Sequence, residues 1–185
     1  MEHSNISKKS IPSLYIEGDR LRLSPFNLEN ITDEYISWLN NPEVVRFSNQ
    51  RFTVHTKDSC KKYFDSFEGT TNQFLAIEDK SCNEMVGTLT VYFNHHHQTA
   101  DVGILFGAVN KWGQGYGLEA FSLIIKTLSS IHAVRKITAG ALACNVGMVK
   151  LMERSGLKLE AVRSGQELVD GRPEDILYFS YFNHV

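Results

Sequence analysis

The residues best suited to chemistry lie in the segment 102–120, VGILFGAVNKWGQGYGLEA. This segment predicts an apolar strand, a turn with Gly113, Gly115 and Gly117 at alternate positions, and the start of a long apolar helix. Glycine allows backbone angles that other residues avoid and lets a ligand approach the main chain. The first amides of a helix have no partner within it, and they lie at the positive end of its dipole. Together these features favour a cradle for a phosphate or pyrophosphate group.

Two better-known phosphate-binding patterns fit this turn poorly. A Walker loop requires G-x-x-x-x-G-K-[ST], and the sequence contains no such run. A dinucleotide-binding fingerprint requires G-x-G-x-x-G; Gly113 and Gly115 begin it, but Leu118 stands at the third glycine. The turn also follows several strands instead of opening a first strand-helix-strand unit. By itself, the turn is still compatible with a glycine-rich helix start that binds no ligand.

Hydrophobic periodicity and turn residues predict the elements that would hold this turn. The expected order is a strand with a turn at 14–23, helices at 31–39 and after Thr56, strands at 74–78, 85–93 and 99–106, a helix at 115–130, a strand at 136–142, a helix at 146–155, and strands at 157–163 and 176–182. This order predicts an α/β fold with a mixed sheet and helices on its faces. The polar residues 1–10 are expected to form a disordered lead, and residues 11–185 one domain.

Composition limits the functional classes. The chain has 185 residues, 42% of them hydrophobic, and a formal net charge of −2. No basic excess indicates a nucleic-acid or anionic-membrane partner, and no apolar run reaches the ~18 residues of a membrane span. Three cysteines without a C-x-x-C spacing argue against a disulfide framework and a cysteine zinc site. We therefore expect a cytoplasmic protein that binds neither nucleic acid nor membrane.

The glycine turn resembles the pyrophosphate loop of the GNAT (GCN5-related) N-acetyltransferase superfamily, whose usual pattern is R/Q-x-x-G-x-G/A. Trp112 stands at the R/Q position, as is familiar in the RimJ/RimL-like branch. Further similar segments follow in the same order across nearly the whole chain: LRLSP at 21–25, WLNNPEV at 38–44, ADVG at 100–103, NVGMVKLMERSGL at 145–157, DG at 170–171 and DILY at 175–178. The resemblance implies the GNAT fold, which is an α/β (α+β) fold. Its mixed, mostly antiparallel sheet is splayed between the two central strands and carries helices on both faces.

The resemblance also implies acetyl-coenzyme A (acetyl-CoA) as co-substrate and direct attack of a primary amine on its thioester. It assigns the pyrophosphate to the main-chain amides of residues 114–118 and the pantetheine arm to a strand edge. The implied cofactor-binding residues are Ile104, Leu105, Phe106, Trp112, Gly113, Gln114, Gly115, Tyr116, Gly117, Leu118 and Asn145. Asn145 would hydrogen-bond the arm or an ordered water, or serve only as a helix cap.

Acetyl transfer needs a neutral amine, a polarised thioester carbonyl and a stable leaving thiolate. A strand amide near Leu105 or Phe106 would polarise the carbonyl. For the base, the resemblance points to Asp101 on the central strand and to Glu160 on a later strand. A carboxylate with an ordinary pKa of ~3.9 is a weak base unless burial raises that pKa. For Asp101 the alternative is an exposed strand end or an ion pair, and for Glu160 it is a surface position on the strand.

The proton donor is where this sequence departs from the family pattern. Many members place a tyrosine where this sequence has Met152, and the RimJ/RimL branch often has a serine at Met148. Methionine cannot donate a proton. The alternatives are Cys144, Tyr116, water, or departure of the thiolate unaided, because a thiol pKa of ~8.5 makes the thiolate a tolerable leaving group.

The run His95-His96-His97 does not predict a metal site. Three consecutive side chains of an extended strand cannot all face one ion, and the sequence offers no further ligand cluster. A solvated turn is the leading interpretation, and a base that faces the substrate is the alternative.

The acceptor groove is expected around the segment 47–52, FSNQRF. Asn49, Gln50 and Arg51 are the predicted substrate-binding residues, because amides and an arginine among aromatic faces suit a sugar ring or a nucleotide phosphate. A small-molecule amine is the expected acceptor, with an amino sugar, free or linked to a nucleotide, as the leading choice. The alternatives are a peptide or ribosomal-protein N-terminus, a non-catalytic coenzyme A binding module, and an unrelated nucleotide-binding protein. The resemblance leaves a homodimer open.

Overall fold

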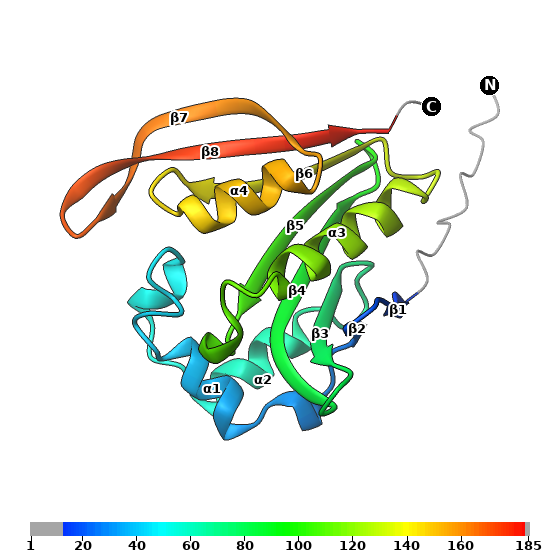
Figure 1. The fold of residues 1–185 in the computed structure, drawn as a ribbon, viewed down its shortest axis with the longest axis vertical. Coiled ribbons are helices and arrows are strands. Elements are labelled where there is room, and N and C mark those ends of the chain that lie inside the picture. Colours follow the sequence, from blue (N-terminus) through cyan, green and yellow to red (C-terminus); the bar gives the residue numbers. More distant parts are fainter. Residues whose placement is uncertain (1–12, 184–185) are drawn as a thin grey trace.

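The computed structural model describes residues 13–183, and Figure 1 shows the arrangement of their elements. The predicted lead at 1–10 lies outside the described residues. Eight strands form one sheet in the order β1-β2-β3-β4-β5-β6-β8-β7. The strands are β1 Ile16–Glu17, β2 Leu21–Pro25, β3 Gln73–Asp79, β4 Glu84–Asn94, β5 Thr99–Phe106, β6 Lys136–Leu142, β7 Lys158–Val169 and β8 Arg172–Phe182. The α-helices are α1 Asp33–Leu39, α2 Lys57–Asp65, α3 Tyr116–Ser129 and α4 Val146–Arg154, and the 3-10 helices are η1 Leu28–Asn30, η2 Asn49–Phe52 and η3 Val109–Lys111.

Helices cover both faces of the sheet, as predicted. Strand β3 shows this directly, because its side chains alternate between two hydrophobic clusters. Leu75 and Ile77 join the larger cluster, which also contains Phe121 of α3. Phe74 and Ala76 point the other way, into the cluster built on α1 and α2. A strand buried on both faces reads as a continuous apolar run, which is the pattern that predicted β3.

The sheet opens at its centre. Strands β5 and β6 are parallel, and they pair only where 99–101 faces 136–138. Beyond Asp101 the two strands separate, while β5 stays paired with β4 as far as Phe106. The edge of β5 that faces β6 therefore has no strand partner over its second half. The predicted splayed, mostly antiparallel sheet is confirmed.

The last two strands are longer than predicted. Strand β7 continues to Val169 and β8 begins at Arg172, so they form a long hairpin around Asp170 and Gly171. Both turn residues have positive φ angles, 50° and 76°, which suit a tight two-residue hairpin turn. The predicted strands at 157–163 and 176–182 left out the polar stretch 164–168. Pairing with β8 extends the strand despite two register shifts.

The segment between α1 and α2 reaches across to this hairpin. Asn49 Nδ2 donates to Glu167 Oε1 at 3.3 Å, and Arg51 Nη2 donates to the carbonyl of Leu168 at 3.2 Å. Figure 1 shows this segment, in cyan, lying opposite the orange hairpin across the open part of the sheet. These contacts join the segment between α1 and α2 to the β7–β8 hairpin across the gap between β5 and β6. None of the helices within residues 13–183 is long and apolar enough to cross a membrane.

Candidate active site

The glycine turn presents a row of free main-chain donors. Gly113 and Gly115 have φ angles of +74° and +84°, in the left-handed region that favours glycine. Within the described residues, no amide from Gly113 to Leu118 donates a hydrogen bond, whereas Trp112 N on one side donates to Val109 O and Glu119 N on the other donates to Gly115 O. Six successive N–H groups at the start of α3 fit the oxygen atoms of a diphosphate.

Arg20 holds this turn in place. Its Nη1 donates to the carbonyl of Gln114 at 3.0 Å, and its Nε donates to Glu119 Oε2 at 2.8 Å. Glu119 Oε1 in turn accepts from the amides of Arg20 at 2.8 Å and Leu21 at 3.1 Å. In a trans peptide the carbonyl and the next N–H point in opposite directions. By drawing the Gln114 carbonyl toward itself, Arg20 turns the Gly115 amide away from the β1–β2 side.

A second cation lies beside the turn. The ring of Tyr116 has the Arg20 guanidinium 4.3 Å from its centre and the Lys111 ammonium 5.4 Å from it. Lys111 forms an ion pair with the buried carboxylate of Asp79, and its hydrogen bond is the main cause that lowers the pKa of that carboxyl well below its usual range. Each of the two cations is paired with a carboxylate, Arg20 with Glu119 and Lys111 with Asp79, so the free amides are the main feature of the turn that favours an anionic ligand.

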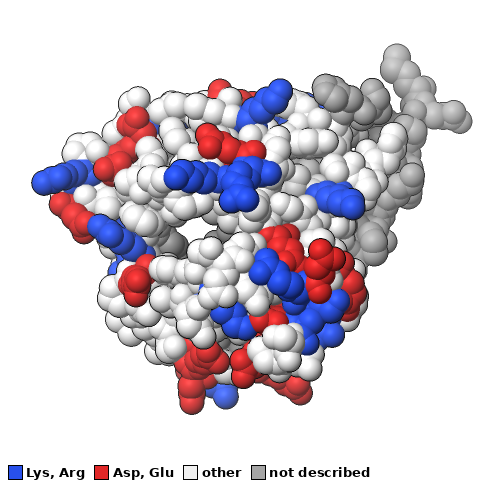
Figure 2. Space-filling view, viewed as in Figure 1, with Lys and Arg blue, Asp and Glu red and all other residues white. Residues whose placement is uncertain are grey.

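A cleft of about 720 Å³ runs from the turn into the splay. Figure 2 shows the molecule hollowed near its middle, with charged side chains around the rim. The predicted cofactor and substrate residues that line the cleft are Gln50, Ile104, Leu105, Phe106, Trp112, Gly113, Gly115, Tyr116, Gly117 and Asn145. Gln114 and Leu118 do not line it with side chains; Gln114 Nε2 turns back to the carbonyl of Asn110, at 2.8 Å. Gln114 and Leu118 were predicted to bind the pyrophosphate through their backbone amides, and these amides make no hydrogen bond within the described residues.

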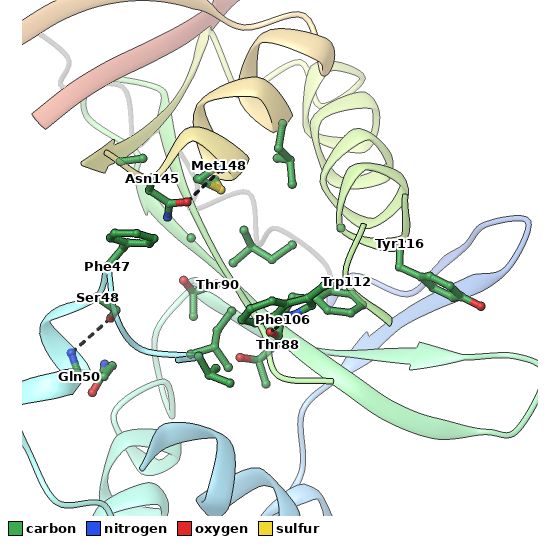
Figure 3. A pocket seen from close by; sticks show the side chains of 18 of the residues that line it. Phe47, Ser48, Gln50, Thr88, Thr90, Phe106, Trp112, Tyr116, Asn145 and Met148 are labelled. Carbon is green, nitrogen blue, oxygen red and sulfur yellow. Dashed lines mark hydrogen bonds between the residues drawn. The ribbon is translucent and has the colours of Figure 1, made fainter. Parts of the chain in front are cut away.

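Trp112 joins the turn to the central strand. Its indole Nε1 donates to the carbonyl of Phe106, the last residue of β5, at 3.0 Å. Figure 3 shows Trp112 and Phe106 side by side, while the hydroxyl of Tyr116 points away from the cleft. The tryptophan at the R/Q position therefore fixes the end of the strand against the loop.

Asn145 caps α4 and also faces the cleft. Its Oδ1 accepts from the amide of Met148 at 3.2 Å, which is the N-cap bond considered as an alternative. Its Nδ2 makes no hydrogen bond within the described residues, and in Figure 3 the side chain lies above Phe47 at the mouth of the cleft. The cap uses the amide oxygen and leaves the amide nitrogen for a ligand.

A smaller cavity of about 280 Å³ adjoins the cleft and contains Asp101. The two cavities share the lining residues Phe47, Val102, Gly103, Gly140 and Ala141. Asp101 is the last residue of β5 that pairs with β6, and Thr138 Oγ1 donates to its Oδ2 at 2.5 Å. Asp101 is an exposed residue, as the strand-end alternative has it, and its carboxylate opens to this cavity. Desolvation by the neighbouring protein atoms raises its pKa, and the hydrogen bond from Thr138 opposes that shift.

The second predicted base lies elsewhere. Glu160 on β7 lines neither cavity and forms an ion pair with Lys136. The hydrogen bond from Lys136 lowers the pKa of Glu160, which makes the carboxylate a weaker base. The structure does not bring Glu160 to the site, and the alternative of a surface position on the strand describes it. Glu167, which sequence reasoning passed over, lines the smaller cavity instead.

The predicted substrate residues are divided between the cavities. Gln50 lines the cleft and Asn49 lines the smaller cavity. Arg51 lines neither, since its guanidinium donates to the carbonyls of Ser48 and Leu168 at 2.8 and 3.2 Å. The structure therefore gives Arg51 the task of tying the segment to the hairpin.

The cleft contains hydroxyls that sequence reasoning did not consider. Met152 is fully buried, and Met148 lines the cleft without a donor group. Cys144 lines neither cavity, and burial raises the pKa of its thiol. Thr90 lines the cleft beside Gly103, where a Cβ would lie 2.8 Å from the threonine Oγ1. The sequence did carry a signal for these hydroxyls: Thr88 and Thr90 stand at alternate positions of an otherwise apolar strand.

The three histidines lie in the turn between β4 and β5. His95 Nε2 is 2.5 Å from Thr71 Oγ1, and its ring stacks on Phe93 with centroids 6.4 Å apart. Neither cavity includes a histidine among its lining residues. The structure supports the interpretation of the three histidines as a surface turn. It gives no support to the alternative of a base that faces the substrate.

Comparison with known proteins agrees with the geometry of the site. Residues 20–158 match the family described as acetyltransferase (GNAT) domain. No curated protein sequence matches the chain. Among solved structures, spermidine N-acetyltransferase from Vibrio cholerae in complex with CoA and spermine is similar with a TM-score of 0.78 and 16% identity, over 90% of this chain and 97% of that one.

Two further structures are similar at the same level. RimL, a ribosomal alpha-N-protein acetyltransferase in complex with coenzyme A, has a TM-score of 0.79 and 14% identity over 91% of this chain and 98% of that one. The microcin C7 self-immunity acetyltransferase MccE, in complex with acetyl-CoA and AMP, has a TM-score of 0.76 and 17% identity over 89% and 93%. At these identities the likeness shows the fold.

The splayed sheet and the open amide turn define an acyl-coenzyme A dependent transferase fold, and the family match is more specific. The chain belongs to the GNAT acetyltransferase family. The predicted family, fold class and enzyme class, an N-acetyltransferase, are confirmed, as is acetyl-CoA as co-substrate.

Proposed function

We propose that this protein transfers the acetyl group of acetyl-CoA directly to a primary amine of a small molecule that occupies the smaller cavity. One observation supports this most strongly: a row of free amides and a carboxylate with a raised pKa lie in two adjoining cavities. The amides of 113–118 suit the diphosphate of the donor. Asp101, at the vertex of the splay, suits the acceptor amine.

The donor is held by main-chain groups. The pantetheine arm would pair with the free edge of β5 around Ile104 and Leu105, as an added strand does at a sheet edge. A β5 amide near Leu105 or Phe106 would polarise the thioester carbonyl as negative charge develops on its oxygen. Asn145 Nδ2 is placed to hydrogen-bond the arm. Holding amine and thioester together supplies a large part of the acceleration.

The proton leaves through Asp101. An alkyl ammonium has no lone pair, so it must lose a proton before its nitrogen can form a bond to the acetyl carbon. Because desolvation raises the pKa of Asp101, the carboxylate is a better proton acceptor than an ordinary aspartate. As the new C–N bond forms, the C–S bond breaks and coenzyme A leaves as thiolate, which solvent protonates. The thiol pKa of ~8.5 allows this departure near neutral pH.

The segment 47–52 and the β7–β8 hairpin favour a small acceptor. Their contacts through Asn49 and Arg51 hold the two segments together beside the smaller cavity, whose volume of about 280 Å³ suits a small molecule. This supports a small-molecule amine over a protein N-terminus.

The test is release of free thiol from acetyl-CoA across a panel of small amines, amino sugars and peptides. We expect turnover with one class of small amine. Tight coenzyme A binding without thiol release from any acceptor would instead support a non-catalytic binding module, for which the methionines at 148 and 152 are the argument. Turnover restricted to peptides would overturn the small-molecule assignment.

A further inference from the structure

The two cavities meet at a glycine of β5. The residues that line both cavities, which we call the junction, have no polar side chain: Phe47, Val102, Gly103, Gly140 and Ala141. Gly103 follows Asp101 by two positions and precedes Leu105 by two, so these three residues face the same side of the sheet. That side is the one covered by α1 and α2, because Leu105 packs against their cluster. In the proposed function, the acyl end of the donor meets the amine at this junction.

Thr90 of β4 brings a hydroxyl to the junction. In the register of the β4–β5 pair Thr90 lies opposite Gly103, and a Cβ at Gly103 would lie 2.8 Å from Thr90 Oγ1. The hydroxyl therefore leans over β5, into the space that a side chain at position 103 would fill. Thr88 lies opposite Leu105, which has a side chain of its own in the corresponding place. Of the two threonines that line the cleft, only Thr90 reaches the junction.

The Thr90 hydroxyl is available to a ligand. It has no hydrogen-bond partner within residues 13–183, where every fully enclosed side-chain oxygen or nitrogen has one, so it opens to the cleft. Figure 3 shows Thr90 on the wall of the cleft, on the same strand as Thr88. A threonine hydroxyl can donate one hydrogen bond and accept two. It can therefore bind a group that arrives over Gly103.

The position of Thr90 selects the group that it can contact. Neighbouring strands lie about 4.8 Å apart, and the pantetheine arm would take the place of a strand on the β6 side of β5. Thr90 comes from β4, on the opposite side, and its hydroxyl lies over β5 itself. About one strand spacing then separates the hydroxyl from the arm, which is too long for a hydrogen bond to the leaving sulfur. That distance leaves room for one atom between them, the attacking nitrogen.

We propose that Thr90 binds the reacting amine: its Oγ1 accepts a hydrogen bond from an N–H of the acceptor and aims the nitrogen lone pair at the acyl carbon. This inference rests on the proposed function and adds a residue to it. The hydrogen that Thr90 holds stays on nitrogen as the N–H of the product amide. The other protons of the ammonium leave by way of Asp101, and coenzyme A leaves as thiolate when the C–S bond breaks.

The first experiment measures binding and needs neither turnover nor the identity of the acceptor. Two coenzyme A thioethers are titrated calorimetrically into the full-length protein. S-(N-ethylcarbamoylmethyl)-coenzyme A has an amide N–H at the place of the attacking nitrogen, and S-(ethoxycarbonylmethyl)-coenzyme A has an ester oxygen there. We expect the wild-type protein to bind the amide about 10-fold more tightly than the ester, because one hydrogen bond distinguishes them.

Thr90→Val keeps the shape of the side chain and removes its hydroxyl. In this variant the amide and the ester should bind equally, with the Kd for coenzyme A itself unchanged. Thr90→Ser keeps the hydroxyl and should retain most of the preference for the amide. No preference in the wild-type protein, or the same preference in Thr90→Val, would overturn the inference.

The second experiment measures thiol release with ethylamine, an acceptor that consists of little more than the reacting nitrogen. We expect kcat/KM to fall about 10-fold in Thr90→Val and to recover in Thr90→Ser, while the pH–rate profile keeps its acidic limb because Asp101 is untouched. Thr99→Val is the matched control: Thr99 lies opposite Asn94 on the same pair of strands and lines neither cavity. An equal loss in Thr99→Val would show that Thr90 has only a structural role. If ethylamine is not turned over, the preference for the amide decides by itself.

The inference can fail separately from the proposed function. If Gly115→Val leaves the affinity for coenzyme A unchanged, the donor binds elsewhere and the proposed function is wrong. If Gly115→Val weakens the binding of both thioethers while Thr90→Val leaves the preference for the amide intact, the donor site is supported and only the role of Thr90 is wrong.

Discussion

The two halves of the site are built differently. The cofactor half uses main-chain amides from six consecutive residues, 113–118, and its shape follows from glycine angles and a helix start. The proposed acceptor half uses side chains from β5, β7, β8 and the segment between α1 and α2, brought together over more than a hundred residues. A backbone site tolerates variation in side chains, whereas the acceptor site changes with a single residue. The comparison explains how one family can share a donor and differ in its acceptors.

The largest effect is expected in the acceptor half, from Asp101→Asn. The amide cannot take the proton from the amine, so kcat should fall about 10²- to 10⁴-fold, with coenzyme A affinity unchanged. In the wild-type protein the rate should fall as the pH falls through the raised pKa of Asp101, because only the ionised carboxylate accepts a proton. The pH–rate profile measures this limb, which the variant should lack. A wild-type profile in the variant would remove Asp101 from the mechanism.

The next largest effect is expected in the cofactor half, from Gly115→Val. Valine is strained at a φ of +84°, and its side chain would point toward Arg20 Nη2, 3.5 Å from the Cβ. We expect the Kd for coenzyme A, measured by calorimetry, to rise about 100-fold, which corresponds to roughly 2.7 kcal/mol.

Gly69→Val is the matched control for that variant. Gly69 has a φ of +69° with nothing within 4 Å, and it lines neither cavity. The control should lose similar stability and keep its coenzyme A affinity. Equal losses of affinity in the two variants would contradict the assignment of the turn.

A smaller effect is expected from Arg20→Met, which removes the bond to the Gln114 carbonyl and retains the apolar stem. The Kd for coenzyme A should rise about 10-fold while kcat at saturating donor stays near the wild-type value, because Arg20 orients an amide and does not meet the acceptor. Arg22→Met, in strand β2 just after Arg20, breaks a comparable ion pair with Glu78 of β3 at 2.6 Å and should leave the Kd unchanged.

The smallest effect is expected from Asn49→Ala. The variant loses one long hydrogen bond, 3.3 Å, between the 47–52 segment and Glu167. KM for the preferred acceptor should rise about 2- to 3-fold, as for a single weak neutral–charged contact near the surface, with no change in coenzyme A affinity. A larger rise would mean that Asn49 itself binds the acceptor.

Two glutamates on β7 show where sequence reasoning reaches its limit. Glu160 and Glu167 lie seven positions apart on one strand, and the family resemblance pointed to Glu160. Register shifts between Leu159 and Ala161 and between Arg163 and Glu167 decide which carboxylate faces the cavity. A one-residue shift moves every following side chain to the other face of a sheet. Neither shift has a signature in the local sequence.

The amino-acid sequence by itself determined the order of the elements, the two-faced sheet and the glycine turn at the start of α3, because periodicity, caps and glycine angles act over a few neighbouring residues. It also indicated Asp101, which stands in a recognisable strand. The tertiary structure alone decided that Arg20 bonds to the glycine turn, that Glu160 pairs with Lys136, and that Glu167 and Asp101 line the same smaller cavity. These are contacts between segments that lie far apart in the sequence. They depend on the register of the strands and on how the strands are connected, and no local sequence pattern encodes either.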